Sequence, residues 1–380
     1  MAAGIYIQVP FCQTKCTYCN FHTGVFAQTL YEPYADAIVQ EIEIRARDAW
    51  PAFDTAYFGG GTPSLLEPGS LTKIFDALRS HFRGAIEEAT LEADPETITL
   101  EKAAAWRDAG FNRVSLGAQS FSDIELKAAG RMHCSADIFS GVERLRAAGI
   151  ENISLDLIAG LPHQTSESWE QSLEKLLQIA PQHVSIYLME IDEGSRLGKE
   201  VLAGGARYGA NWLPTEDDMA AFFERASDCL AAAGFEHYEI SNWALPGFRS
   251  RHNLKYWRRE PYLGLGAGAH SFDGTQRWAN NHDPRAYVAA IARRDLPTEQ
   301  NEKVTLQQAL EEEIFLGLRQ LEGIEISKFA GPHKLSILRR IEELQEHKLV
   351  IVADGRLRLA PERLAISNEV FVALLDAVSA

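Results

Sequence analysis

Short runs of β-branched and apolar residues alternate with longer amphipathic stretches along the first half of the chain. The runs predict six strands, at residues 5–9, 55–58, 89–93, 113–116, 153–158 and 184–188. The stretches between them predict helices at residues 34–50, 71–81, 100–109 and 166–179, the last with Ser166 as its N-cap. This order is typical of repeated βα units and a parallel sheet, either as a partial barrel or as a doubly wound sheet.

The strict alternation stops after residue 190. Residues 192–214 are rich in glycine and charge and predict a long loop, followed by a helix at 216–233 and a strand at 237–243. From residue 305, helices at 306–321 and 335–347 precede strands at 349–353 and 356–360 around an Asp354-Gly355 turn, and a final helix follows. We expect an α/β fold of three units: a (βα)6 core at 1–190, an extension packed on it at 191–300, and a winged-helix-like α+β domain at 301–380.

The charge balance narrows the choice of partners. The 380 residues include 53 acidic and 37 basic side chains, a formal net charge of −16, and so acidic a surface repels phosphate backbones. Residues 301–380 hold 13 acidic and 10 basic side chains, which favours a packing or partner-binding domain over a DNA reader. The chain has no apolar run of membrane-spanning length and no signal-peptide pattern at its start. We expect a cytoplasmic protein that does not bind nucleic acid.

Three of the five cysteines, Cys12, Cys16 and Cys19, crowd into eight residues directly after the first predicted strand. Ligands of parallel α/β sheets bind at the carboxyl ends of the strands, so this loop lies where a cofactor is expected. Soft thiolates select iron–sulfur clusters or zinc. Three cysteines would leave one iron of a four-iron cluster open, whereas a structural zinc site would need His22 as a fourth ligand.

Polar residues also follow the later strands. A Gly59-Gly60-Gly61-Thr62 run comes after the second strand, and glycine there lets backbone carbonyls approach a ligand's ammonium group. Each polar position alone is also compatible with a turn, a cap or a salt bridge. Because they lie at the ends of successive strands, we instead expect them to converge on one edge of the sheet. The side chains in question are Glu92, Asp94, Gln119, Arg131 and Asp156.

The cysteine spacing, with Tyr18 before the third cysteine and a six-fold βα pattern behind it, resembles the radical SAM superfamily. That resemblance implies a partial (βα)6 barrel, a [4Fe-4S] cluster on Cys12, Cys16 and Cys19, and S-adenosylmethionine on its open iron, from which one electron releases a 5′-deoxyadenosyl radical. It implies that the glycine run holds the methionine amino group, and that Gln119, Arg131 and Asp156 contact the ribose and carboxylate. The implied S-adenosylmethionine contacts are Tyr6, Tyr18, Gly59, Gly60, Gly61, Thr62, Glu92, Gln119, Arg131 and Asp156.

From about residue 4 to 376 the chain resembles the oxygen-independent coproporphyrinogen III oxidase family. The matching stretches are 6–12, 59–63, 92–95, 114–121, 130–133 and 156–162. Two departures favour the heme-chaperone subgroup of that family, the HemW type. The sequence starts at the first strand, without the oxidases' N-terminal extension, and Phe21 stands where they carry a further cysteine. Gln8 also replaces the histidine of a common Tyr-x-His-x-Pro pattern, which speaks against a histidine relay there.

The run His252-Asn253-Leu254-Lys255-Tyr256-Trp257 matches the HNxxYW motif of that subgroup. His252 could offer an imidazole to heme iron while Tyr256 and Trp257 stack on the porphyrin, and His270 is a second candidate ligand. The alternative is a rigid turn anchored by buried aromatic rings, with His252 only hydrogen-bonded.

Two functions remain open on the sequence. The first is a heme chaperone that binds heme and passes it to an acceptor protein, with the cluster and S-adenosylmethionine controlling transfer. The second is oxidative decarboxylation of coproporphyrinogen III. Either role implies a flavodoxin- or ferredoxin-like electron donor, and the chaperone role also implies a heme acceptor and is compatible with a homodimer.

Overall fold

The core of the protein is a parallel sheet of six strands, as the alternation of the sequence predicts. The computed structural model describes residues 2–329 and 331–379. The strands are β1 (Ala3–Val9), β2 (Phe53–Gly60), β3 (Glu88–Ala93), β4 (Arg113–Gln119), β5 (Asn152–Ala159) and β6 (His183–Leu188). They lie side by side in chain order and all pair in parallel. All six carboxyl ends therefore meet at one edge, which is where the predicted site residues were expected.

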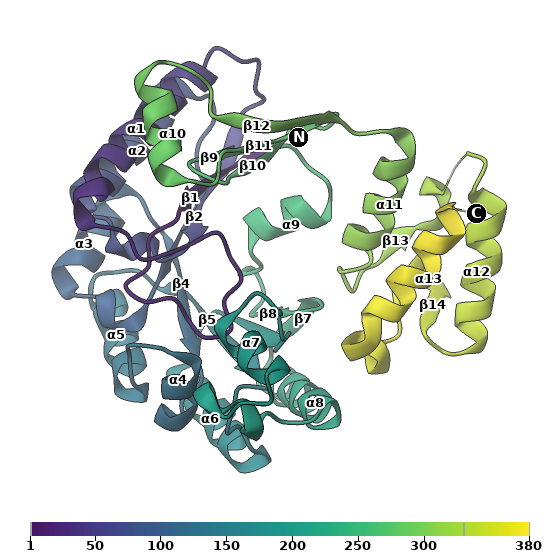
Figure 1. The fold of residues 1–380 in the computed structure, drawn as a ribbon. Helices are drawn as coiled ribbons and strands as arrows, with labels where there is room; N and C mark the ends of the chain where they lie inside the picture. Colours follow the sequence, from purple (N-terminus) through teal and green to yellow (C-terminus); the bar gives the residue numbers. More distant parts are fainter. Residues whose placement is uncertain (1, 330, 380) are drawn as a thin grey trace.

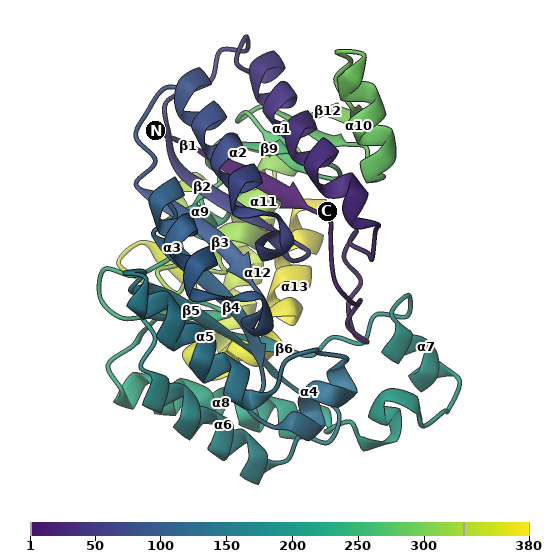
Figure 2. The same cartoon turned by 90° about the vertical axis from the view of Figure 1, so that its left-hand side faces the viewer.

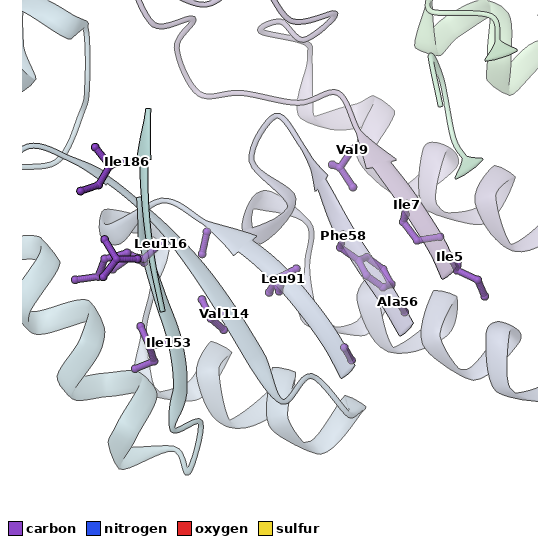
Figure 3. Packing of buried hydrophobic residues seen from close by; sticks show 14 of the residues in the cluster. Ile5, Ile7, Val9, Ala56, Phe58, Leu91, Val114, Leu116, Ile153 and Ile186 are labelled. Carbon is purple, nitrogen blue, oxygen red and sulfur yellow. The ribbon is translucent and has the colours of Figure 1, made fainter. Parts of the chain in front are cut away.

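Helices cover the outer face of this curved sheet (Figure 1). They are α1 (Tyr31–Arg45), α2 (Pro68–His81), α3 (Leu100–Ala109), α4 (Asp123–Ala129), α5 (Ser135–Ala147) and α6 (Ser166–Ile179). Alternate strand residues such as Ile5, Phe58 and Leu91 are fully buried and point towards the helices (Figure 3). The opposite set, which includes Tyr6 and Tyr57, faces the inside of the barrel and carries most of the polar chemistry.

The segment after the core adds strands to both edges of the same sheet. The hairpin β7 (Glu236–Glu239) and β8 (Asn242–Ala244) joins β6, while β9 (Tyr262–Leu265) pairs in parallel with β1. Three antiparallel strands continue from β9: β10 (His270–Phe272), β11 (Gln276–Asn280) and β12 (Thr298–Lys303). The described sheet thus has twelve strands. Its outermost strand, β12, is almost entirely exposed and polar.

Buried Glu41 on α1 ties this extension to the core. Its carboxylate accepts hydrogen bonds from the Gly266 amide (2.9 Å), the Asn280 side chain (2.8 Å) and the Tyr287 hydroxyl (2.7 Å). Tyr287 lies on α10 (Pro284–Ala292). Burial raises the pKa of Glu41, although Arg45 and these three donors act in the opposite direction. One carboxylate on the first helix therefore fixes segments more than 200 residues away in the chain.

Several local expectations differ from the structure. The first helix ends at Arg45 rather than at residue 50. Thr165, not Ser166, caps α6, because the Thr165 hydroxyl accepts the Ser168 amide. The expected single strand at 237–243 is the β7–β8 hairpin.

The expected loop at 192–214 is also partly helical. It contains α7 (Arg196–Leu202), capped by the Ser195 hydroxyl on Gly198 N (2.8 Å), and a 3₁₀ segment at Arg207–Trp212. The helix could not be predicted from the sequence, because Leu197 is its only large apolar side chain that is buried. The helix α8 (Glu216–Ala232) follows it, one residue shorter than expected.

The C-terminal domain has the predicted winged-helix-like order. It consists of α11 (Leu306–Gly317), β13 (Ile324–Glu325), α12 (Lys334–Glu346), β14 (Val350–Ala353), β15 (Arg356–Leu359) and α13 (Ser367–Ser379), with strand order β13-β15-β14. Asp354 and Gly355 have φ of 53° and 71°, as a tight hairpin turn requires. No helix in the described residues is long and apolar enough to cross a bilayer.

One helix, α9 (Arg251–Trp257), lies between the two edges of the open barrel (Figure 1). Its N-terminal amides at Arg251 and His252 donate to Glu88 at the start of β3 (3.0 and 2.9 Å). On its outer side, Arg319 of the C-terminal domain lies over the Trp257 ring (4.5 Å). The helix therefore connects the inside of the barrel with the last domain.

Candidate cofactor site

The loop that carries the three cysteines is closed at its base and held at its tip. Cys12 N donates to Gly24 O and Gly24 N to Pro10 O, both at 2.9 Å, which pins the loop where it leaves β1. At the far side, Thr17 N donates to Ala129 O (2.9 Å) and Thr17 O accepts from Leu197 N (2.8 Å). The helices α4 and α7 therefore support the loop. Figure 2 shows the loop running beside α7. Residues 192–214 were expected to form a long loop, so the support from α7 was not predicted.

The three thiols are half-buried and lie close enough to one another to interact electrostatically. Burial raises the pKa of Cys12 to about 11; a hydrogen bond from Thr23 lowers it, and Asp94, Cys19 and Cys16 raise it further. Arg131 Nη1 approaches Cys16 Sγ at 3.4 Å. Three thiolates together therefore require added positive charge, which a bound metal cluster supplies. This donor set fits an iron–sulfur cluster with one open iron.

The zinc alternative is not assembled in the part of the chain that the structure describes. His22 lies on the surface with its ring against His282, centroids 5.4 Å apart. No group of three His, Cys, Asp or Glu among residues 2–329 and 331–379 is placed to hold a single metal ion. A cluster makes no such demand, because its cysteines bind different irons.

Glu92 and the glycine run form one side of the site. Glu92 Oε2 accepts the Gly60 amide (3.0 Å) and Oε1 accepts the Tyr57 hydroxyl (2.8 Å). Burial raises the Glu92 pKa to about 7; the Tyr57 hydroxyl lowers it, and Asp156 and Asp94 raise it. A carboxyl group with such a pKa is ready to ionise beside a ligand's ammonium group. Glu92 therefore fits the S-adenosylmethionine contact that the resemblance implied, and the ligand's ammonium group is a suitable partner for it.

Each of the three glycines is required for a different steric reason. A Cβ at Gly59 would come within 3.1 Å of the Glu92 carboxyl group, and Gly60 has φ of 111° with the Gln8 side chain in the space of a Cβ. At Gly61 a Cβ would lie 3.1 Å from Cys12 Sγ and 2.5 Å from Phe11 O. The run therefore lets β2 approach both the carboxylate and the cysteine loop.

Arg131 joins the cysteine loop to the ends of β3 and β4. Its Nη2 forms an ion pair with Asp94 and donates to Gly117 O (3.0 Å), and Asp94 also accepts the Thr62 hydroxyl (2.8 Å). Its Nε is buried and has no hydrogen-bond partner among the described residues, which leaves a donor for a ligand's carboxylate. Gln119 lies close by: a Cβ at Gly117 would be 3.0 Å from Gln119 Nε2 and 3.2 Å from Arg131 Nη2.

Three predicted contacts lie around this group. Asp156 is deeper in the barrel, where Ser115 and Ser154 donate to it (3.2 and 3.3 Å) and burial raises its pKa. Tyr6 donates to Gln8 Oε1 (2.7 Å). Tyr18 packs on the small apolar cluster that includes Leu197. A narrow crevice opens between the loop and the strand ends, lined by Gln13, Thr14, Cys16, Asp94, Glu96, Gly130, Arg131 and Met132.

Comparison with known proteins assigns the family. Residues 6–176 match the Radical SAM superfamily and residues 304–362 the HemN C-terminal domain. The chain is 34% identical to "Heme chaperone HemW" of Bacillus subtilis (strain 168) over 377 residues, 97% of this chain and 98% of the relative. The protein of the same name from Lactococcus lactis subsp. lactis (strain IL1403) is 35% identical over 96% of this chain and 95% of its own. The chain belongs to the HemW family.

A solved structure agrees on the fold of this HemW-family protein. Coproporphyrinogen III oxidase (HemN) from Escherichia coli superposes with a TM-score of 0.83 over 99% of this chain and 90% of its own, at 22% identity. A mouse relative, "Radical S-adenosyl methionine domain-containing protein 1, mitochondrial", is 31% identical over 98% of this chain and 87% of its own. The expected radical SAM fold with a separate C-terminal domain is thereby confirmed.

The HNxxYW motif of this HemW-family chain lies on α9, away from the cysteines. His252 is buried; its Nδ1 pairs with the Thr55 hydroxyl and its Nε2 with the Tyr256 hydroxyl, both at 2.8 Å. Burial, with Lys255 and Arg113 nearby, lowers the His252 pKa to about 3, so the ring is neutral. Both ring nitrogens are thus engaged inside the protein. Trp257 instead meets Arg319, and His270 is exposed at the start of β10.

Tyr57, which was not among the predicted site residues, links the motif to the cofactor site. Its ring stacks on His252 (centroids 5.3 Å) and lies 6.1 Å from Tyr6, while its hydroxyl holds Glu92. The signal was available in the period-two alternation of β2, which puts Tyr57 on the inner face of the barrel next to Gly59. These contacts make His252 a support for the ring that orients Glu92.

Proposed function

We propose that the protein is a heme chaperone of the radical SAM type, which binds heme and passes it to an acceptor protein. The observation that carries this is similarity at 34–35% identity along nearly the whole chain to proteins named heme chaperones. Similarity over both the barrel and the C-terminal domain supports a shared function of the intact molecule, and not only of one site.

Each residue predicted to contact the cluster or S-adenosylmethionine has a role in this function. Cys12, Cys16 and Cys19 hold the [4Fe-4S] cluster. The glycine run and Glu92 receive the amino group of S-adenosylmethionine, Arg131 its carboxylate, and Gln119 and Asp156 its ribose. When bound and reduced, the cluster and S-adenosylmethionine together supply a 5′-deoxyadenosyl radical. Thr62, Tyr6 and Tyr18 shape the surroundings of this pocket.

The second candidate is coproporphyrinogen III oxidation, and the complete set of S-adenosylmethionine contacts favours it. A protein that only carried heme would not need a complete S-adenosylmethionine site with Arg131, Glu92 and the glycine run. Phe21 argues against the oxidase function, because by resemblance the oxidases carry a further cysteine at that position.

One anaerobic preparation separates the two functions. Cluster-loaded protein is first given S-adenosylmethionine, a low-potential reductant and coproporphyrinogen III, and then, in a second sample, is titrated with hemin. The chaperone predicts no decarboxylated porphyrin, a stoichiometric Soret band and transfer of that heme to an apo-hemoprotein. Repeated turnover to a decarboxylated product would establish the oxidase. A Cys16→Ala variant should lose the cluster, while the matched Cys229→Ala variant on α8 should keep it.

The heme-chaperone function also concerns an electron donor, the assembly state and the cellular compartment. The electron donor is a flavodoxin- or ferredoxin-like protein, since cleavage of S-adenosylmethionine needs one low-potential electron. A homodimer fits transfer that depends on assembly state, and sedimentation with and without heme tests it. None of the five cysteines forms a disulfide with another described residue, which fits a reducing compartment, and the cytoplasm stays our prediction.

A further inference from the structure

Three histidines from separate segments gather at the rim of the barrel. His22 lies on the cysteine loop, His270 begins β10, and His282 lies in the turn before α10. The His22 and His282 rings are 5.4 Å apart, and His22 is close enough to His270 to lower its pKa. All three are on the surface. We call this group the rim histidine cluster.

The cluster is at the same edge as the cofactor site. Because β9 runs parallel to β1, the turn from β9 to His270 lies at the carboxyl edge of the sheet, beside the loop that holds Cys12 and Cys19. His282 is brought to this turn by Gly268, where a Cβ would lie 3.6 Å from His282. The fold therefore brings these residues together over about 260 positions of sequence.

The cluster has the chemistry of an iron-ligand site. Glu299 Oε2 is 3.8 Å from His282 Nδ1, which is beyond hydrogen-bond distance, so the nitrogens of this 65% exposed ring are open to a metal. Burial, Arg277 and His22 lower the His270 pKa, which keeps that ring neutral. Two apolar side chains of the same loop, Phe21 and Val25, are 67% and 63% exposed. They offer a surface to a flat apolar ring.

We propose that the rim histidine cluster supplies the axial ligand of heme iron, with His282 as the principal ligand and the porphyrin lying on the apolar loop at Phe21. This rests on the proposed heme-binding function and assigns its site. Heme iron needs only one or two protein ligands, so the cluster need not form a complete site for a free metal ion. His252 is not the ligand in this proposal, because both of its ring nitrogens are hydrogen-bonded inside the protein.

The test is a titration of cluster-loaded protein with hemin and, in parallel, with iron-free protoporphyrin IX. Replacing His22, His270 and His282 together by alanine should weaken hemin binding at least about tenfold, equal to about 1.4 kcal/mol, and shift the Soret band. Protoporphyrin affinity should change less, because it has no iron to ligate. His282→Gln alone should give the largest single effect and keeps the proposal testable where the triple variant folds poorly.

Matched controls are His81→Ala and His347→Ala, two exposed histidines on α2 and after α12, which should bind hemin as wild type does. Iron content is measured for each variant, since His22 is close to Cys19. An unchanged Soret band in both the triple variant and His282→Gln overturns the site, as does loss of the iron ligand in His252→Asn with the rim intact. Equal loss of hemin and protoporphyrin would assign the surface to stacking and overturn ligation. Wild-type protein that binds no hemin would instead overturn the proposed function.

Discussion

Glu92 shows how one buried group can couple the site to pH. Its pKa of about 7 lies above the ordinary value of 4.5, chiefly because burial penalises the charged form. A carboxyl group whose pKa is raised by folding stabilises the fold below its unfolded pKa, and this contribution is lost as pH rises through the folded pKa. The relevant window therefore runs from about pH 4.5 to 7.

We predict that cluster-loaded wild-type protein without S-adenosylmethionine loses stability relative to Glu92→Gln between these two pH values. The relative change in the free energy of unfolding should reach about 3 kcal/mol at most, since each pKa unit corresponds to about 1.4 kcal/mol. Denaturant unfolding at several pH values measures it. Parallel pH profiles of the two proteins would show that Glu92 does not titrate in this range.

Gly60 provides a steric prediction at the same scale. Its φ of 111° and the Gln8 side chain beside it leave no room for a Cβ. Gly60→Ala should destabilise the protein by about 1–3 kcal/mol and weaken S-adenosylmethionine binding, read by equilibrium dialysis. Gly69→Ala on α2 is the control, because nothing lies within 4 Å of its added Cβ. It should be neutral or slightly stabilising.

At the scale of elements, periodicity was enough to predict the parallel core. All six strands and the α3 and α6 helices were found, because burial on one face leaves a regular pattern. Short elements left none: α7 depends on one buried leucine and a serine cap, and α9 buries a histidine, a leucine and a lysine. The candidate site followed the same rule. Strand-end residues could be placed, and the alternation of β2 puts Tyr57 on the inner face, while the gathering of the rim histidines depends on tertiary contacts that no local pattern records.

The α9 helix itself can be tested through His252. His252→Ala would leave the buried Thr55 and Tyr256 hydroxyls without their partner, which should cost about 2–4 kcal/mol of unfolding free energy. It should also lower S-adenosylmethionine affinity through Tyr57 and Glu92. Asn253→Ala, its neighbour on the same helix, is the comparison. A fully stable His252→Ala protein would contradict the structural role.

At the scale of the molecule, Glu41 joins the extension to the core. Glu41→Ala removes the acceptor of the Gly266, Asn280 and Tyr287 hydrogen bonds and leaves buried donors unsatisfied. We expect a loss of about 3–5 kcal/mol in unfolding free energy. Glu43→Ala on the exposed face of the same helix should stay within about 0.5 kcal/mol of wild type. Because His270 and His282 belong to this extension, heme affinity should fall together with stability.

The exposed strand β12 has a consequence for assembly. A sheet that ends in an open, apolar strand invites a second sheet to continue it, and chains with such edges aggregate. Here the last strand reads Thr-Glu-Gln-Asn-Glu-Lys, with five of its six residues exposed. Charged side chains along the edge discourage another backbone from adding to it. Oligomers of this protein are therefore expected to meet through helices or loops, and the protein should resist fibril growth at concentrations where strand-to-strand contacts would otherwise propagate.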